Sequence, residues 1–174
     1  VENAKTSYNL TKQTQDLAVA SAKRNLLNSS VTPIASMDTR FIPNNPTVSG
    51  SYLCDYENEY KIQMISDNLA NVTDINGGSY MINYSSVPQA IGACGLYLAF
   101  DVSKNYTGGE WKITLPNKTA TTYASNLHAY NSAVQAREQA LINASTSITN
   151  ATLSLNQTSA GARAEDIASA RASL

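Results

Sequence analysis

The sequence predicts an α+β fold, in which an N-terminal helix and a long C-terminal helix flank an antiparallel β-rich middle with one disulfide. Apolar residues recur at heptad spacing near both ends of the chain and alternate with polar residues in the middle. The chain also has two cysteines. The two helices would form a helical hairpin or a coiled-coil stalk. We expect four segments: a helix over 1–31, an irregular connection over 32–50, the disulfide-bonded middle over 51–116, and a long helix over 117–174 with a break near 158–161.

The N-terminal helix is expected over residues 3 to about 30, which contain neither Gly nor Pro. Four of its residues lie near heptad spacing: Leu10, Leu17, Arg24 and Leu27. The Asn-Ser-Ser sequence at 28–30 and Pro33 would end the helix, because Pro disfavours helical backbone in the residue before it. The Pro-rich connection that follows has no sustained period, and we expect only a short strand at Arg40–Ile42.

Apolar and polar residues alternate in four segments of the middle, which we predict to be strands: 60–64, 80–84, 96–102 and 111–115. The loop Ser103–Gly109 would join the last two strands as an antiparallel hairpin. A disulfide between Cys54 and Cys94 would close a loop of about 41 residues and stabilise the fold by roughly 4 kcal/mol in the chain-entropy model. The alternative is a pair of unpaired buried thiols.

The C-terminal helix is expected over 120–157, with Asn117 or Thr119 as its N-cap. Residues at alternating spacings of four and three form its seam: Tyr123, Leu127, Tyr130, Val134, Arg137, Leu141, Ala144, Ile148, Ala151 and Leu155. Such a helix needs a partner to cover its seam. The shorter N-terminal helix would cover part of it, and another chain or the rest of this one would cover what remains. A charge at a seam position costs stability, so Arg137 is expected to meet a carboxylate on a neighbouring helix. After the break we expect a kink or a second short helix, with Thr158 or Ser159 as its N-cap.

The residue inventory predicts no catalytic site, no metal and no cofactor. His128 is the only histidine and adjoins the seam, so we interpret it as an interface or solvated residue. The acidic residues Asp55, Glu57 and Glu59 are interpreted as a solvated strand edge or loop. The turn at Asp74 fails the EF-hand spacing, since Ser85 stands where the pattern requires Glu.

The composition limits the kinds of partner that the chain is expected to bind. Charged residues make up 14% of the chain and the net charge is −1, which argues against binding to nucleic acid. No apolar run approaches the roughly 20 residues that a membrane span needs. The chain begins at Val1, without a starting Met or a signal peptide, which fits a processed mature protein or an excised ectodomain.

Nine Asn-X-Ser/Thr sequons occur, more than chance predicts: Asn9, Asn28, Asn71, Asn83, Asn105, Asn117, Asn143, Asn150 and Asn156. They favour a glycoprotein that is extracellular or on a cell surface, with the periplasm as an alternative. A polar bacterial or phage surface whose sequons are never used is the other interpretation.

Tyrosine is the dominant aromatic residue, with ten copies against two of Phe. Seven tyrosines of the middle region could build a face that binds glycans or a protein: Tyr52, Tyr56, Tyr60, Tyr80, Tyr84, Tyr97 and Tyr106. Cross-strand aromatic pairs on a half-buried sheet are the favoured interpretation.

Three functional hypotheses follow. The leading one is a non-enzymatic extracellular structural or assembly subunit of a filament, appendage, envelope or virion surface, whose partners are copies of itself or another helical surface protein. The second is a sensory or receptor ectodomain that binds a small ligand in the β-rich middle. The third is an adhesin or receptor-binding head that uses the tyrosines. The order of helix, middle region and helix resembles that of bacterial flagellins in arrangement only, and neither end has residues that match that family.

Overall fold

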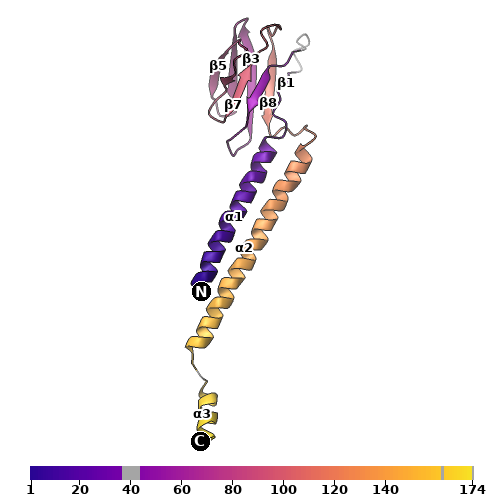
Figure 1. Ribbon diagram of the computed structural model, residues 1–174. Helices are drawn as coiled ribbons and strands as arrows, with labels where there is room; N and C mark the ends of the chain where they lie inside the picture. The colour runs from indigo at the N-terminus through magenta and orange to yellow at the C-terminus, as the bar shows by residue number, and fades with distance from the viewer. Residues whose placement is uncertain (37–43, 162, 174) are drawn as a thin grey trace. The chain divides into compact units, whose positions relative to one another are not determined.

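The fold is described from a computed structural model, which covers residues 1–36, 44–161 and 163–173 (Figure 1). Helix α1 (Glu2–Leu27) and helix α2 (Tyr123–Ser159) flank two antiparallel sheets, and a short helix α3 (Ala164–Ala172) follows. The predicted α+β class is confirmed. The strand expected at Arg40–Ile42 lies outside the described residues. The chain divides into two compact units, one made of residues 1–19 and 132–174 and the other of residues 20–131.

The β-rich unit contains two sheets. The five-stranded sheet has the order β1-β8-β3-β4-β5, and the three-stranded sheet has the order β2-β7-β6. Every pairing within them is antiparallel. The strands are β1 (Ile34–Ala35), β2 (Thr47–Gly50), β3 (Asn58–Ser66), β4 (Leu69–Asp74), β5 (Ser79–Asn83), β6 (Gln89–Ala90), β7 (Leu96–Ala99) and β8 (Glu110–Leu115).

Both sheets contribute to one hydrophobic core. Alternate residues of β3 are buried, as are those of β8, and β7 adds Leu96 and Leu98 from the other sheet. Four aromatic rings pack edge-on or tilted in this core: Tyr84, Phe100, Tyr106 and Trp111. Leu27, at the end of α1, is also buried in it. The alternation that predicts the strands is therefore the alternation of buried and exposed side chains.

The predicted hairpin between the third and fourth strands is wrong. Strand β7 pairs with β2 and β6, whereas β8 pairs with β1 and β3 in the other sheet. The loop Ser103–Gly109 crosses from one sheet to the other. Because the core-facing residues of both strands are fully buried, the two strands serve better as opposite walls of the core than as neighbours in one sheet.

The predicted disulfide between Cys54 and Cys94 is present, with the two Cα atoms 5.3 Å apart. Both cysteines lie just outside strands, Cys54 before β3 and Cys94 before β7. The backbone N–H of Leu53 also donates to the carbonyl of Cys94 at 2.9 Å, so the two segments are joined by a hydrogen bond as well as by the disulfide.

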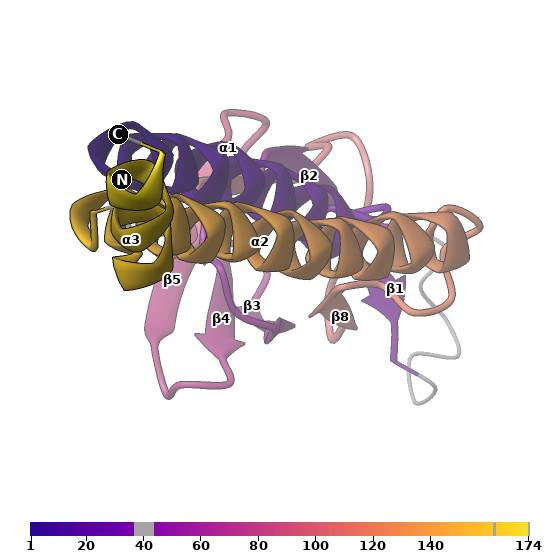
Figure 2. The same cartoon turned by 90° about the horizontal axis from the view of Figure 1, so that it is seen from below.

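Helix α1 packs on α2, and Figures 1 and 2 show the two helices side by side with opposite chain directions. The half-buried face of α1 carries a mixture of small, polar and apolar residues at heptad spacing: Ala4, Tyr8, Thr11, Gln15, Val19 and Ala22. Two leucines of the predicted pattern lie outside this face, since Leu10 and Leu17 are 60% and 66% exposed, whereas Leu27 is buried. Both sets have a seven-residue repeat, so spacing alone does not distinguish them.

Helix α2 begins at Tyr123, three residues after the predicted start, because a turn precedes it. The Oδ1 atom of Asn117 accepts bonds from the backbone N–H and hydroxyl of Thr119, and the carbonyl of Asn117 accepts from the N–H of Ala120. At the other end, Thr158 bonds the carbonyl of Ser154 within α2. It therefore does not cap α3, whose N-cap is Arg163.

Candidate functional site

An ion pair lies between α1 and α2. The Nε atom of Arg137 donates to Oδ1 of Asp16 at 2.5 Å, and the Nζ atom of Lys12 lies 2.5 Å from Oδ2 of the same carboxylate. Asp16 is thus the carboxylate that Arg137 meets on the neighbouring helix. The bonds from Lys12 and Arg137 lower the pKa of Asp16 below its usual value. The side chains of Arg137 and Asp16 keep 34% and 38% of their surface in solvent, so water screens the pair.

A second polar contact joins the helices next to the sheets. The Nδ2 atom of Asn126 donates to the carbonyl of Asn25 at 3.1 Å and to the hydroxyl of Ser29 at 2.8 Å. Ser29 is buried, so this bond satisfies a hydroxyl that water cannot reach. Asn126 is not among the seam residues selected from the sequence, because a polar residue gives no signal in an apolar pattern.

Eight of the ten residues of the expected α2 seam are half-buried, and none is fully buried. The exceptions are Val134 and Leu155, which are 37% and 53% exposed. The α1–α2 contact therefore covers the seam only in part.

Large apolar side chains remain exposed on the helices: Leu10, Leu17, Ile142, Leu153, Leu155 and Ile167. From Thr152 onward, every described residue of α2 and α3 is exposed. The last part of α2 is therefore a helix with no packed face among the residues that the structure describes. These exposed residues, 152–161 and 163–173, are called the C-terminal helical segment below.

The structure separates the nine sequons by accessibility. Asn117 is buried, and its Nδ2 atom donates to the carbonyl of Ser30 at 3.2 Å. Asn28 is half-buried and is bonded through both side-chain atoms, with Nδ2 donating to the carbonyl of Tyr52 and Oδ1 accepting from its N–H. Asn71 is half-buried as well. The remaining six sequon asparagines are exposed: Asn9, Asn83, Asn105, Asn143, Asn150 and Asn156.

The seven tyrosines of the middle region do not form one exposed face. Tyr52, Tyr60 and Tyr106 are buried in the core, and Tyr80 and Tyr84 pack against it. Burial raises the pKa of Tyr60 to about 12. Only Tyr56 and Tyr97 are exposed. Most of these tyrosines therefore lie in the core or against it. Their hydroxyls have local partners, as where the Tyr52 hydroxyl donates to the carbonyl of Tyr56.

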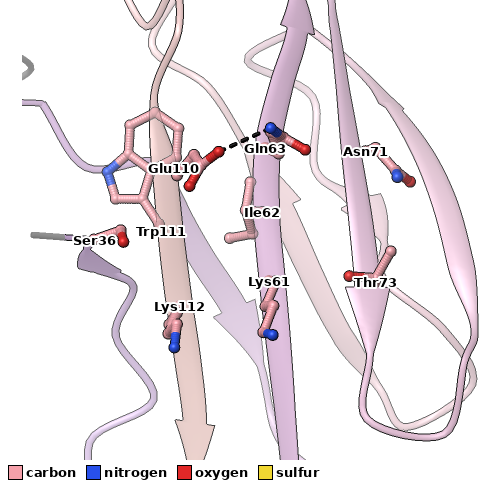
Figure 3. Close-up of a pocket in the computed structure, with 9 residues that line it drawn as sticks. All are labelled: Ser36, Lys61, Ile62, Gln63, Asn71, Thr73, Glu110, Trp111 and Lys112. Carbon is pink, nitrogen blue, oxygen red and sulfur yellow. Dashed lines mark hydrogen bonds between the residues drawn. The ribbon is translucent and has the colours of Figure 1, made fainter. Parts of the chain in front are cut away.

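A groove of about 250 Å³ lies on the exposed face of the five-stranded sheet (Figure 3). Lys61 on β3 and Lys112 on β8 are directly opposite each other in the strand register, and Gln63 is opposite Glu110. The Nε2 atom of Gln63 donates to Oε1 of Glu110 at 2.8 Å. These residues were not selected from the sequence, because only the strand register brings them together. The surface defined by Lys61, Gln63, Glu110 and Lys112 is called the sheet-face groove below.

The residues considered for chemistry lie apart or have local partners. His128 is exposed on α2. Asp55 and Glu57 precede β3, and Glu57 lies 3.7 Å from Lys118. The carboxylate of Asp74 accepts bonds from the N–H groups of Asn76 and Gly78 and from the hydroxyl of Tyr80. In the described parts of the chain, no three His, Cys, Asp or Glu side chains gather as a metal site would require.

None of the helices within the described ranges combines the length and the apolar character that crossing a membrane would take.

Comparison with known proteins gives weak similarities. No family model matches the chain, and no curated protein matches it. Among solved structures, Xanthomonas campestris FlgL in a crystal of space group C2 is 17% identical over 84% of this chain and 55% of that chain, with a TM-score of 0.29. The same protein in space group H3 is 13% identical over 76% of this chain and 55% of that chain, with a TM-score of 0.21. The chain thus spans about half the length of the FlgL chains that it matches, and no family is assigned from these values.

Proposed function

We propose that this chain is a non-enzymatic extracellular structural subunit that assembles through helix packing, with copies of itself as the partner. The observation that carries the proposal is the exposure of every described side chain in the C-terminal helical segment. Isolated helices shorter than about 12–15 residues are marginal in water, and most helical stability in proteins comes from a packed face. A packing partner would supply that face.

The apolar residues of the helices support the same proposal. Leu155 continues the spacing of the α2 seam, whereas Ile142 and Leu153 lie eleven residues apart, a spacing that puts both on one face of a helix. On α1, Leu10 and Leu17 are exposed one heptad apart. Exposed apolar side chains at helical spacing are typical of helix-packing surfaces.

The disulfide supports the extracellular part of the proposal. Disulfides persist in oxidising compartments and are rare in the cytosol of most organisms. Cys54 and Cys94 join segments 40 residues apart in the sequence, as structural disulfides of exported domains do. Under this proposal residues 51–116 form a β-rich head, and the six exposed sequons carry glycans.

Light scattering coupled to size-exclusion chromatography, over a micromolar concentration series, tests the assembly. We expect the wild-type chain to form dimers or larger species. The double variant Leu153→Gln, Leu155→Gln should be monomeric, since Gln keeps the helix propensity of Leu and removes its apolar surface. The matched control is Thr152→Gln, Ser154→Gln, which changes the neighbouring exposed residues and should assemble as the wild type does. A strictly monomeric wild-type chain would contradict the proposal.

A further inference from the structure

The sheet-face groove contains a pair of like charges that the fold does not require. Lys61 and Lys112 are directly opposite on neighbouring strands, an arrangement that destabilises a sheet. The Nζ atom of Lys112 lies 3.7 Å from Oε1 of Glu59. Among the residues that the structure describes, Lys61 has no ion-pair partner. An anion between the two ammonium groups would remove the repulsion.

The other end of the groove carries the opposite charge. Glu110 lies two residues before Lys112 on β8, so about 7 Å of strand separates the two positions. Figure 3 shows Lys61 and Lys112 at one end of the groove and Glu110 with Gln63 at the other. The hydroxyl of Thr73 and the amide of Asn71, on β4, add neutral polar groups along the side. The described residues of the groove thus present Lys61 and Lys112, then a polar margin, then Glu110.

We propose that the sheet-face groove binds a small zwitterion, with a carboxylate between Lys61 and Lys112 and an ammonium group at Glu110. The volume of about 250 Å³ suits a molecule of the size of a free amino acid. Trp111 is buried, so the groove residues that the structure describes offer no exposed aromatic ring on which a sugar could stack. The spacing of the charges favours an amino acid whose amino group is at the far end of its chain over one with adjacent charges. The proposal is independent of assembly, because all the residues involved lie on the sheet.

The binding test uses 5-aminopentanoate as the probe, with pentanoate and pentylamine as matched ligands that each lack one charge. Chemical-shift changes in the isotope-labelled full chain, at constant ionic strength, would measure the affinity. Because exposed ion pairs are weak, we expect saturable binding on the order of millimolar. Each single-charge ligand should bind at least about fivefold more weakly, a factor that corresponds to one exposed ion pair. Absence of saturable shifts, or equal affinity for pentanoate, would overturn the proposal.

Three variants locate the site. Lys61→Gln should weaken 5-aminopentanoate binding to the level of pentylamine, and Glu110→Gln should weaken it to the level of pentanoate. The control is Lys104→Gln, which changes another exposed lysine; its Nζ atom lies 3.4 Å from Oδ2 of Asp101 in the loop after β7. It should bind as the wild type does. Lys61 and Lys104 are exposed and Glu110 is half-buried. Unchanged amide spectra outside the groove would show that each variant is folded. A loss in Lys104→Gln equal to that in Lys61→Gln would overturn the proposed site.

Discussion

The guanidinium of Arg137 on α2 and the carboxylate of Asp16 on α1 lie 2.5 Å apart, at a position where the seven-residue repeat requires a packed side chain. Lys12 donates a hydrogen bond to the second carboxylate oxygen, so the Asp16 carboxylate has two cationic partners. Only one alignment of the two helices places Asp16 opposite Arg137. The pair therefore favours one register of the α1–α2 contact, in which small side chains such as Ala140 and Ala144 of α2 also take part.

Helix pairing should weaken in acid because of Asp16. The bonds from Lys12 and Arg137 lower its pKa from 3.8 in the folded chain. A carboxyl group with a lowered folded pKa adds stability above its unfolded pKa, and this contribution is lost as the pH falls through the folded value. We expect the wild-type chain to melt at a higher temperature than Asp16→Asn near neutral pH, as followed by far-UV circular dichroism.

Comparison of the two proteins in acid provides the control. Asp74 and Asp101 also have lowered pKa values, through their hydrogen bonds to backbone and side-chain groups. As Asp74 and Asp101 gain protons, the wild type and Asp16→Asn lose the same amount of stability. Below the folded pKa of Asp16, the melting temperatures of wild type and Asp16→Asn should therefore converge. A difference that persists unchanged in acid would show that the charge of Asp16 does not stabilise the pairing.

The helices could be predicted from the sequence because their signal is local. The absence of Gly and Pro over 26 positions is enough to predict α1, whichever of its faces is covered. Which face packs could not be predicted, because the packed stripe contains Thr11 and Gln15 while Leu10 and Leu17 remain outside. Packing of α1 depends on α2 and on the Asp16–Arg137 pair, and neither is visible in the periodicity of α1 alone.

The sheet was harder to predict because its pairings join distant segments. Strand β4 was missed since only Ala70 and Val72 of its six residues are buried, which gives too weak an alternation. Strands β1 and β6 have two residues each and depend on their neighbours. The sheet-face groove could not be predicted for the same reason, because Lys61 and Lys112 are 51 positions apart in the sequence and meet only through the register of β3 and β8.

Reduction of the disulfide should destabilise the β-rich unit. Cys54 and Cys94 are separated by 40 positions, and closure of such a loop is worth roughly 4 kcal/mol in the chain-entropy model. We expect a reductant to lower the free energy of unfolding in urea by about that amount. The variant Cys54→Ala, Cys94→Ala should unfold like the reduced wild type and be insensitive to reductant. If reductant leaves wild-type unfolding unchanged, the disulfide does not stabilise the fold.

Asn117 should act as a structural residue and remain free of glycan in the folded protein. It is buried, donates to the carbonyl of Ser30 and accepts two bonds from Thr119. Asn117→Ala leaves buried polar groups without partners and should cost about 1–3 kcal/mol of unfolding free energy. The matched control Asn156→Ala changes an exposed sequon and should stay within about 0.5 kcal/mol of wild type.

Mass spectrometry of protein from its source would examine the same residue. We expect the peptide that contains Asn117 to be unmodified, and any glycans to lie on exposed sequons such as Asn150. Full occupancy at Asn117 would mean that this turn is open when the glycan is added, and the packing described around Ser30 would then be incorrect.

The close approach of two glycines holds β2 against the start of β7. Gly50 has a φ of +89°, and a Cβ atom there would lie 2.2 Å from the carbonyl oxygen of Gly95. Gly50→Ala therefore adds a clash with backbone to the strain of left-handed geometry. Gly108 has a φ of +71°, and nothing lies within 4 Å of a Cβ atom added there. Gly108→Ala therefore adds the strain of left-handed geometry without a clash. We expect Gly108→Ala to cost about 1–2 kcal/mol and Gly50→Ala clearly more, as measured by urea unfolding. Equal losses in the two variants would mean that β2 can move away from Gly95 at no cost, which would contradict a fixed β2–β7 pairing.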